Sequence, residues 1–318
     1  MRFLKFTLLV LGICALTMVL LEFTFRNYST SADRLFQTYY SKTDSVQTIY
    51  IGNSHIGVFT DLFPAEVKEV GNLSLGGQDI FRMYSVLKTV LPKSHALKKI
   101  YMGLDYDLIG YNQTKSGQEY IDREYFKYTG ELYNNNMTNR AMSQSFFFRS
   151  NRDIAYIFKR NKDEKKDLNF IPVTNSAPVA VIADTTSAQT KNIVALPHKT
   201  LDPFMCRKRA EEHSLLKFKQ KNIGENLEYL NKIIALCNQY NIQLVLFDPP
   251  KTECYRANCN KENVTHAKQV IDSFAIANKT PYLDFYNDTT FTDDMFVDFD
   301  HLNATGVKIL NNKLSAHQ

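Results

Sequence analysis

Two distant segments of the chain carry residue types that together can cleave an ester. Ser54 lies in the tetrad GNSH (52–55), and the segment DDMFVDFDHLNATGV (293–307) contains Asp298 and His301 three residues apart. A serine hydroxyl is a weak nucleophile at neutral pH, so it needs a histidine to take its proton and a carboxylate to hold the other ring nitrogen. The Asp-x-x-His spacing puts both of these groups on one turn. We therefore expect Ser54, His301 and Asp298 to act as nucleophile, general base and orienting carboxylate.

Simpler explanations exist for both segments. Asn53 and Ser54 suit the N-cap of a helix, and the Asp, Asn and Thr residues of the second segment are also typical of a helix start. Asp300 is the competing carboxylate, but because it is adjacent to His301 we expect it to point away from the ring. A metal site built from Asp298, Asp300 and His301 is a further alternative. The sequence offers no other ligands nearby, so we expect neither a metal nor another cofactor.

The elements that must position these residues alternate between strands and helices. The expected strands span 45–52, 98–110, 241–250 and 280–288, and the expected helices span 78–91, 223–240, 263–277 and 304–314. This alternation predicts a three-layer α/β domain around a mostly parallel sheet. Functional loops of such sheets lie at the carboxyl ends of the strands, so we expect both segments at the same edge.

The middle of the chain, from about residue 111 to 221, does not follow this alternation. It is rich in aromatic residues and Asn, and NSAPVAVIADTTSAQTKN (175–192) has the composition of an exposed loop or linker. We expect an insertion that is helical at its ends and forms a wall for substrate, although core packing explains its aromatic residues equally well. The expected organisation is an anchor (1–26), a polar connector (27–44) and one domain (45–318) that carries the insertion.

The N-terminus has the composition of a membrane anchor. Arg2 and Lys5 precede the apolar stretch 6–25, whose only charge is Glu22. The charge-free run 6–21 has a length between that of a signal-peptide core and a full span of about 20 residues, and Phe23 to Phe25 extend its apolar character. No small-x-small cleavage site follows directly. We therefore expect an uncleaved, single-pass anchor in the inner membrane rather than a cleaved signal peptide. The positive-inside tendency places the N-terminus in the cytoplasm and the domain on the extracytoplasmic side.

The charge distribution argues against a nucleic-acid partner. The formal net charge is +5 over 318 residues, and basic residues are interleaved with acids, as in RNKDEKKD (160–167) and RKRAEEH (207–213). Nucleic-acid binders concentrate their basic residues on one face. We therefore expect no nucleic acid among the partners.

Four cysteines follow the anchor, namely Cys206, Cys237, Cys254 and Cys259. An even number outside the cytoplasm permits disulfides. The CYRANC spacing suits a bridge between Cys254 and Cys259, and free thiols are the alternative, most plausibly for Cys237 in an apolar helix. The pairing stays open at this point.

Four blocks of the sequence together resemble the SGNH hydrolase superfamily. They are GNSH (52–55), GNLSLGGQ (71–78), GLDYDL (103–108) and DFDHLNATG (298–306). The resemblance covers both ends of the extracytoplasmic part and skips the insertion. With the anchor, these blocks are similar to the envelope branch of the superfamily, which includes polysaccharide O-acetylation proteins and the anchored protein of teichoic-acid D-alanylation. The resemblance implies an SGNH-like, flavodoxin-like α/β/α fold and the triad of Ser54, Asp298 and His301.

The resemblance also implies where an oxyanion would be stabilised. Gly76 or Gly77 would supply a backbone N–H donor. His55 directly follows Ser54, so we expect its side chain to point elsewhere, either in a structural role or toward substrate.

The third block departs from the family pattern. The family offers an asparagine donor there, whereas this sequence has Asp105, whose carboxylate would repel an oxyanion. Asn72 or Asn53 would have to replace the missing donor, whose loss typically costs about a hundred- to a thousand-fold in rate.

The expected function is a membrane-anchored, extracytoplasmic serine esterase or O-acyltransferase that acts through an acyl-Ser54 intermediate. Its substrate would be an envelope polysaccharide or an acylated glycan, and a transferase would need an integral membrane partner to deliver the acyl group. The alternative is a non-catalytic binding or assembly protein of the same fold for envelope glycan, which Asp105 and the unusual GNSH turn favour.

Overall fold

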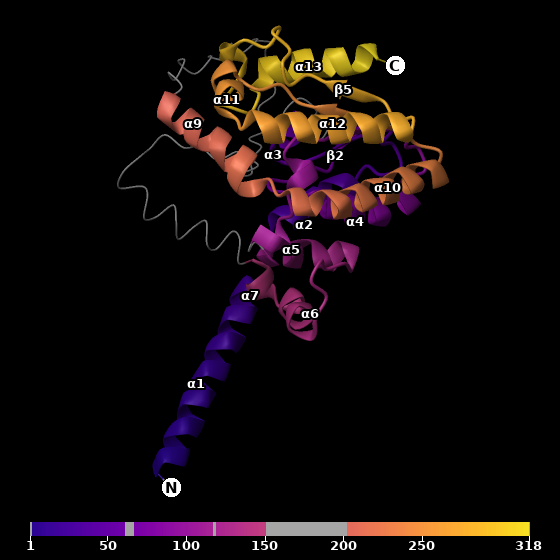
Figure 1. The fold of residues 1–318 in the computed structure, drawn as a ribbon. Coiled ribbons are helices and arrows are strands. Elements are labelled where there is room, and N and C mark those ends of the chain that lie inside the picture. The colour runs from indigo at the N-terminus through magenta and orange to yellow at the C-terminus, as the bar shows by residue number, and fades with distance from the viewer. Residues whose placement is uncertain (1, 61–66, 117–118, 151–201, 318) are drawn as a thin grey trace, which may run out of the picture.

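Five parallel strands form the sheet at the centre of the molecule. The computed structural model describes residues 2–60, 67–116, 119–150 and 202–317. The strands are β1 (Thr48–Ile51), β2 (Val70–Asn72), β3 (Lys99–Gly103), β4 (Gln243–Asp248) and β5 (Tyr282–Asp284). They lie in the order β2-β1-β3-β4-β5, and each neighbouring pair is parallel. This is the flavodoxin-like order, and it confirms the predicted α/β class (Figure 1).

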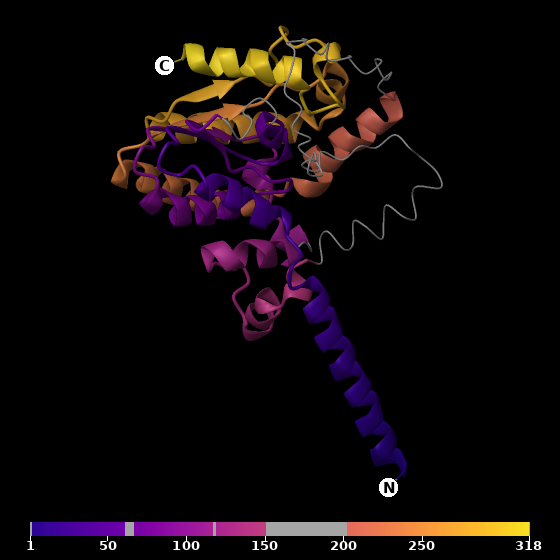
Figure 2. The same ribbon diagram turned by 180° about the vertical axis from the view of Figure 1, so that it is seen from behind.

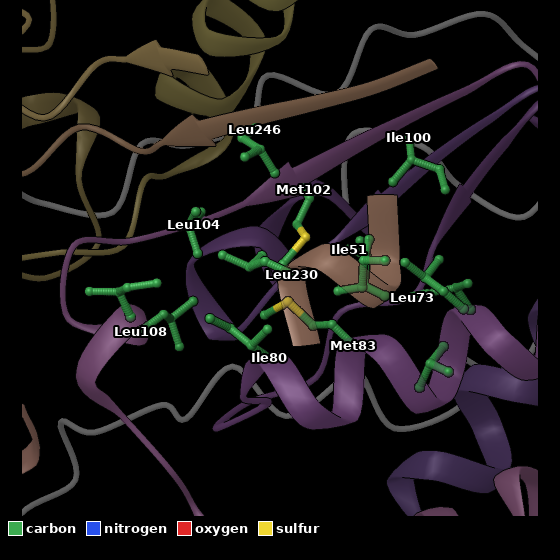
Figure 3. Packing of buried hydrophobic residues seen from close by; sticks show 14 of the residues in the cluster. Ile51, Leu73, Ile80, Met83, Ile100, Met102, Leu104, Leu108, Leu230 and Leu246 are labelled. Carbon is green, nitrogen blue, oxygen red and sulfur yellow. The ribbon is translucent and has the colours of Figure 1, made fainter. Parts of the chain in front are cut away.

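Helices cover both faces of this sheet. One face carries α2 (Ser31–Tyr40), α4 (Ile80–Val90), α10 (Ile223–Gln239) and α12 (Lys261–Ala277), and the other carries α13 (Ala304–Ala316). Successive strand residues point to opposite faces, so Ile49 and Ile51 of β1 join the larger core while Tyr50 joins the smaller one. Figure 3 shows part of the larger core, with Met83 of α4 and Leu230 of α10 among its members.

Capping side chains set where the predicted helices begin. Asp79 accepts a hydrogen bond from Arg82 N at the start of α4. The helix expected from residue 263 begins at Lys261 instead, because Asn260 caps it by accepting from Asn263 N. Such a cap satisfies backbone donors that would otherwise lack a partner at a helix start.

The segment expected to be a polar connector, 27–44, contains a helix that belongs to the domain. In α2, Thr30 and Asp33 form a capping box, and Phe36 and Tyr39 are buried in the larger core. Gly71 of β2 makes room for this packing, because a Cβ there would lie 3.0 Å from the Tyr39 ring. The polar composition of the segment hid an amphipathic pattern. β2 was also not predicted, because it has only three residues and a glycine at its centre.

The described parts of the insertion are helical. They comprise α5 (Glu119–Thr129), α6 (Met137–Gln144), α7 (Phe146–Arg149) and α9 (Pro203–Glu211), the last continuing into a π-helical turn (Glu212–Lys217). The loop expected at 175–192 lies outside the described residues. Helix α9 packs against α11 (Glu253–Asn258), which follows β4.

Helix α1 (Arg2–Phe25) projects from the body of the molecule (Figures 1 and 2). None of its residues is buried, and it is long and apolar enough to cross a membrane. At 1.5 Å per residue it spans about 36 Å, against about 30 Å for a bilayer core. Its C-terminal end is tied to the start of α7, where Glu22 accepts hydrogen bonds from Ser145 Oγ at 2.6 Å and Phe146 N at 2.7 Å.

Candidate active site

Two glycines leave the space in which the serine-bearing turn packs against the sheet. Helix α3 (Ser54–Gly57) follows β1 directly, and its Ile56 is fully buried. A Cβ on Gly52 would lie 2.3 Å from Ile56 Cγ1, and a Cβ on Gly103 would lie 2.2 Å from the same atom. Among the described residues, Gly52 is not one of those with positive φ. Gly52 is therefore needed for the space that it leaves for Ile56, and not for a backbone conformation that favours glycine.

Ser54, His301 and Asp298 lie in one chain of hydrogen bonds. The Oγ of Ser54 is 2.9 Å from Nε2 of His301, and Nδ1 of His301 is 2.9 Å from each oxygen of Asp298. The serine follows β1 and the other two residues follow β5, so the carboxyl edge of the sheet brings them together. An imidazole held in this way can accept the serine proton and be stabilised by the carboxylate once it is charged.

Asp298 also shapes the loop on which it lies. Its Oδ1 accepts hydrogen bonds from the backbone N–H groups of Asp300 at 3.1 Å and His301 at 2.8 Å. An antiparallel bridge between Phe296 and Leu302 closes the base of the loop. The Asp-x-x-His spacing thus works locally, as the sequence suggested, because one carboxylate organises both the backbone and the ring.

Asp300 points toward the ring of His301, contrary to the expectation that it would point away. Its Oδ1 lies 3.2 Å from His301 Nδ1. Its Oδ2 accepts hydrogen bonds from His55 Nε2 and Arg209 Nε, both at 3.0 Å. The carboxylate is buried, and a buried charge must be paired. Burial raises the pKa of Asp300, but Arg209, His301 and His55 lower it more, so that it falls well below the usual range.

Asp105 is paired with a lysine instead of standing as a free negative charge. Its Oδ1 lies 2.6 Å from Lys251 Nζ and 2.7 Å from His55 Nδ1, and its Oδ2 accepts from Asn53 Nδ2 at 2.9 Å. Burial raises the pKa of Asp105, but the charges of His55 and Lys251 lower it more. The carboxylate therefore holds the residues on both sides of Ser54, which gives this departure from the family pattern a structural purpose.

His55 is enclosed within this network and does not face outward. It is 4 % exposed, with Nδ1 near Asp105 and Lys251 and Nε2 on Asp300. Of the two roles that the sequence left open, the contacts correspond to the structural one.

The electrostatics of the site make His301 a strong base. Burial lowers its pKa, but the carboxylates of Asp300 and Asp298 raise it more, to about 9. A base of this strength is largely protonated at neutral pH. Proton transfer from Ser54 therefore becomes more available as the pH rises toward 9.

The expected oxyanion donors are of two kinds: two glycines in one turn, and two asparagines whose amides already donate hydrogen bonds. Gly76 and Gly77 lie in the turn between β2 and α4, after the strand that neighbours β1, and Gly77 has a φ of 75° that favours glycine. Asn72 donates from Nδ2 to the carbonyls of Ile56 at 3.0 Å and Gly57 at 3.4 Å. This amide thus ties the end of α3 to β2. Asn53 donates to Asp105, as described above, so both amides serve the structure of the turn.

A disulfide links two helices beside the site, and it is not the Cys254–Cys259 bridge that the short spacing offered as one possibility. Cys206 of α9 is bonded to Cys254 of α11, whereas Cys259 is a buried free thiol. Cys259 Sγ lies 3.4 Å from Tyr106 OH. The short CYRANC spacing suggested a local loop, but the helical geometry of α11 turns Cys254 toward α9. Cys237 is a buried free thiol, one of the alternatives that the sequence left open.

Three ligand-type side chains gather at the site. His55, Asp300 and His301 bring potential metal ligand atoms within 4.8 Å of one another. The ring nitrogens of both histidines already face hydrogen-bonding partners, which are Ser54 and Asp298 for His301. These donors fit a hydrogen-bonded network better than a metal centre.

Arg209, Lys251 and His213 belong to the site but were not found from the sequence. Lys251 follows β4 at the carboxyl edge, so its position in the predicted fold could have identified it. Arg209 and His213 come from the insertion, where no alternation of strands and helices placed them. His213 Nδ1 lies 2.8 Å from Tyr255 OH and 3.4 Å from Asp300 Oδ2.

Comparison with known proteins finds similarity among solved structures only. No family model and no curated protein matches the chain. A GDSL-like lipase from Bacteroides thetaiotaomicron is 8 % identical with a TM-score of 0.40, covering 92 % of this chain and 96 % of that chain. A lipase/acylhydrolase from Enterococcus faecalis is 9 % identical with a TM-score of 0.37, covering 86 % and 95 %. An acetyl xylan esterase is 10 % identical with a TM-score of 0.38, covering 86 % and 99 %. Similarity this distant carries no argument, so the fold rests on the sheet order and the function on the site.

Proposed function

We propose that this protein is a serine esterase or O-acyltransferase in which Ser54 forms an acyl-enzyme. The observation that carries the proposal is the chain of hydrogen bonds from Ser54 Oγ through the His301 ring to Asp298. The hydroxyl, the imidazole and the carboxylate have the arrangement that nucleophilic acyl transfer requires. A role of Ser54 at the helix start alone would not explain why the His301 ring contacts its hydroxyl.

The proposed reaction proceeds in two balanced steps. Nε2 of His301 takes the proton of Ser54 as Oγ attacks the ester carbonyl, and Nδ1–H stays hydrogen-bonded to Asp298. The tetrahedral intermediate then expels the alcohol, which receives the proton from Nε2. In the second step His301 takes a proton from water or from a sugar hydroxyl, which attacks the acyl carbon. The bond to Ser54 Oγ then breaks, and Nε2 returns the proton to Oγ, which restores the free serine. The backbone N–H of Gly77 or Gly76 is the proposed oxyanion donor.

We further propose that the enzyme works on envelope glycan at the outer side of the cytoplasmic membrane. The apolar helix α1 supports an anchor, and the Cys206–Cys254 disulfide supports an oxidising compartment. Because α1 is tied to α7 through Glu22, the domain would stay close to the membrane. Glycans assembled there, and an integral membrane protein that delivers acyl groups, are the proposed substrate and partner.

The alternative of a non-catalytic binding protein has less support than the enzyme. It rests on Asp105 in the place of the family's asparagine and on the unusual GNSH turn, and Lys251 neutralises the Asp105 carboxylate at 2.6 Å. A protein that binds glycan without turnover is therefore one possible result of the labelling experiment described next, and not a second proposal.

Labelling with a fluorophosphonate probe tests the proposed chemistry. The wild-type protein should be labelled, and Ser54→Ala and His301→Ala should each lose the label. Ser41→Ala, which changes an exposed serine at the end of α2, is the matched control and should label normally. A folded wild-type protein that resists the probe and also releases no acid from p-nitrophenyl acetate would exclude the proposal.

Accessibility to protease tests the proposed orientation. In spheroplasts of a bacterial expression host, protease added from outside should digest the domain after residue 26. Digestion only after the membrane is permeabilised would contradict the extracytoplasmic placement.

A further inference from the structure

Asp300 connects groups from three separate elements. Its own loop provides His301, α3 provides His55, and α9 provides Arg209. The Asp300 side chain has no solvent exposure, whereas that of Asp298 is 36 % exposed. Both carboxylates approach the same ring nitrogen of His301, at 3.2 Å for Asp300 and 2.9 Å for Asp298.

The difference in burial decides which carboxylate acts more strongly on the ring. Water screens the charge of a half-exposed group, while a charge in the interior acts through a much lower effective dielectric. Asp300 therefore acts more strongly on the charge of the His301 ring than Asp298 does, although it lies slightly farther from Nδ1. A need for packing alone does not explain it, since replacing a buried ion pair by apolar residues is often neutral or stabilising.

On the premise that Ser54 is the nucleophile, we propose that Asp300 is a positioning residue that holds His301 jointly with Asp298. In this arrangement Arg209 moderates the charge of Asp300, so the two residues together set how firmly the imidazole keeps its proton. His55 extends the connection to the nucleophile, because it follows Ser54 in the chain and donates from Nε2 to Asp300 at 3.0 Å.

The charged and titratable groups around His301 determine the sign of each effect. Asp298 and Asp300 favour the charged ring and raise its pKa against the opposing effect of burial. From α3, the His55 ring lies with its centroid 4.6 Å from that of His301. From α9, Arg209 reaches the ring only through Asp300, on which its Nε donates at 3.0 Å.

Two further groups complete these surroundings. His213 lies 3.4 Å from Asp300 Oδ2, and burial lowers the pKa of His213 well below its usual range, which leaves its ring neutral. Lys251 acts on His55 and Asp105 and has no direct contact with His301 among those that the structure gives. Asp300 and Arg209 are thus the two neighbouring residues whose opposite charges should have opposite effects on the His301 ring.

Opposite charge changes should move the pH dependence in opposite directions. Removing the negative charge with Asp300→Asn weakens the hold on the proton, so His301 becomes a base at lower pH. Removing the positive charge with Arg209→Gln leaves Asp300 uncompensated and moves the transition to higher pH. A neighbouring charge shifts such a transition by about 1 to 3 pH units. A purely structural role would alter folding but not produce shifts of opposite sign.

The experiment measures the rate of fluorophosphonate labelling between pH 6 and about 10, with folding checked by circular dichroism. The midpoint for Asp300→Asn should fall by at least about 1 unit, and that for Arg209→Gln should rise. Arg207→Gln removes an exposed arginine of the same helix, and Asp293→Asn an exposed aspartate before the same loop; both should match the wild type.

The outcomes separate this inference from the proposed function. A folded wild type without labelling at any pH overturns the proposed function and this inference with it. Normal wild-type labelling with unmoved midpoints in the two test variants overturns the inference alone. If Asp300→Asn does not fold, Arg209→Gln decides, since the Arg209 side chain is 30 % exposed and its replacement buries no new charge.

Discussion

His55 and His301 lie side by side at the same edge of the sheet, yet their surroundings differ in one respect that separates structure from chemistry. Both rings contact Asp300. His301 turns its second nitrogen to the hydroxyl of Ser54, whereas His55 turns its second nitrogen to the buried Asp105–Lys251 pair. A histidine with a hydroxyl on one side can pass a proton to a substrate. One enclosed between buried charged groups mainly holds the chain in place.

Replacing His301 should have the largest effect, and this effect should be on the catalytic rate. His301→Gln should lower kcat/KM for p-nitrophenyl acetate on the order of 10⁴-fold or more, because the proton of Ser54 then has no acceptor. Its unfolding midpoint in urea should fall at neutral pH, because the charged ring no longer pairs with Asp300 and Asp298, so folding is checked separately by circular dichroism. His95→Gln, at an exposed position, is the control and should leave both quantities unchanged. An activity within about tenfold of the wild type would remove His301 from the chemistry.

Replacing the buried charged groups that His55 contacts should instead lower the stability of the fold. Lys251→Met removes the lysine charge beside Asp105, and the side chains of both residues have no solvent exposure. The free energy of unfolding should fall by about 3–5 kcal/mol in a urea titration. The double variant Lys251→Met, Asp105→Asn should recover much of that loss. Equal destabilisation by Lys98→Met, which changes an exposed lysine, would show that the buried pair has no special role.

A size change beneath α3 should disturb both rings at once, because Ser54 and His55 share this turn. Gly103→Ala brings a Cβ to 2.2 Å from Ile56 Cγ1. Overpacking of this kind costs about 1–3 kcal/mol, and displacement of Ser54 should also slow labelling. Adding Ile56→Ala should restore part of the labelling rate. Gly224→Ala, where a Cβ would meet nothing within 4 Å, should not lower it.

The smallest expected effect is the wild-type pH dependence, in which rate and stability move in opposite directions. His301 has its pKa raised from an ordinary 6.5 to about 9. The base form therefore increases with pH, and labelling should rise about tenfold per unit until it levels off near 9. The stability due to this raised pKa is fully present below pH 6.5 and is lost as the pH rises through about 9. A labelling rate that is flat from neutral pH upward would contradict the assigned pKa.

The parts of the molecule that follow regular periodicity were predictable from the sequence. Strands β1, β3, β4 and β5, together with α4, α10, α12 and α13, lie within or close to the expected ranges. Their order in a parallel α/β sheet then placed the loops after β1 and β5 at one edge. The closeness of Ser54 and His301 follows from this topology, together with the chemical need of a serine for a base.

The rest could not be predicted, because it depends on contacts between segments without a periodic signal. The partners of Asp300 come from α3 and α9, and nothing in the local sequence shows that Arg209 would reach it. Cys206 and Cys254 are 48 positions apart, so their pairing depends on how α9 packs on α11. The purpose of Asp105 became visible only with Lys251 beside it.

Mapping a trapped acyl group shows directly whether Ser54 is the nucleophile. The wild-type protein is mixed briefly with p-nitrophenyl acetate, quenched in acid, digested and analysed by mass spectrometry. We expect one acetyl group on the peptide that contains Ser54, and none on that peptide in Ser54→Ala or His301→Ala. A folded protein that hydrolyses the ester while its acetyl group accumulates on another residue would show that Ser54 is not the nucleophile.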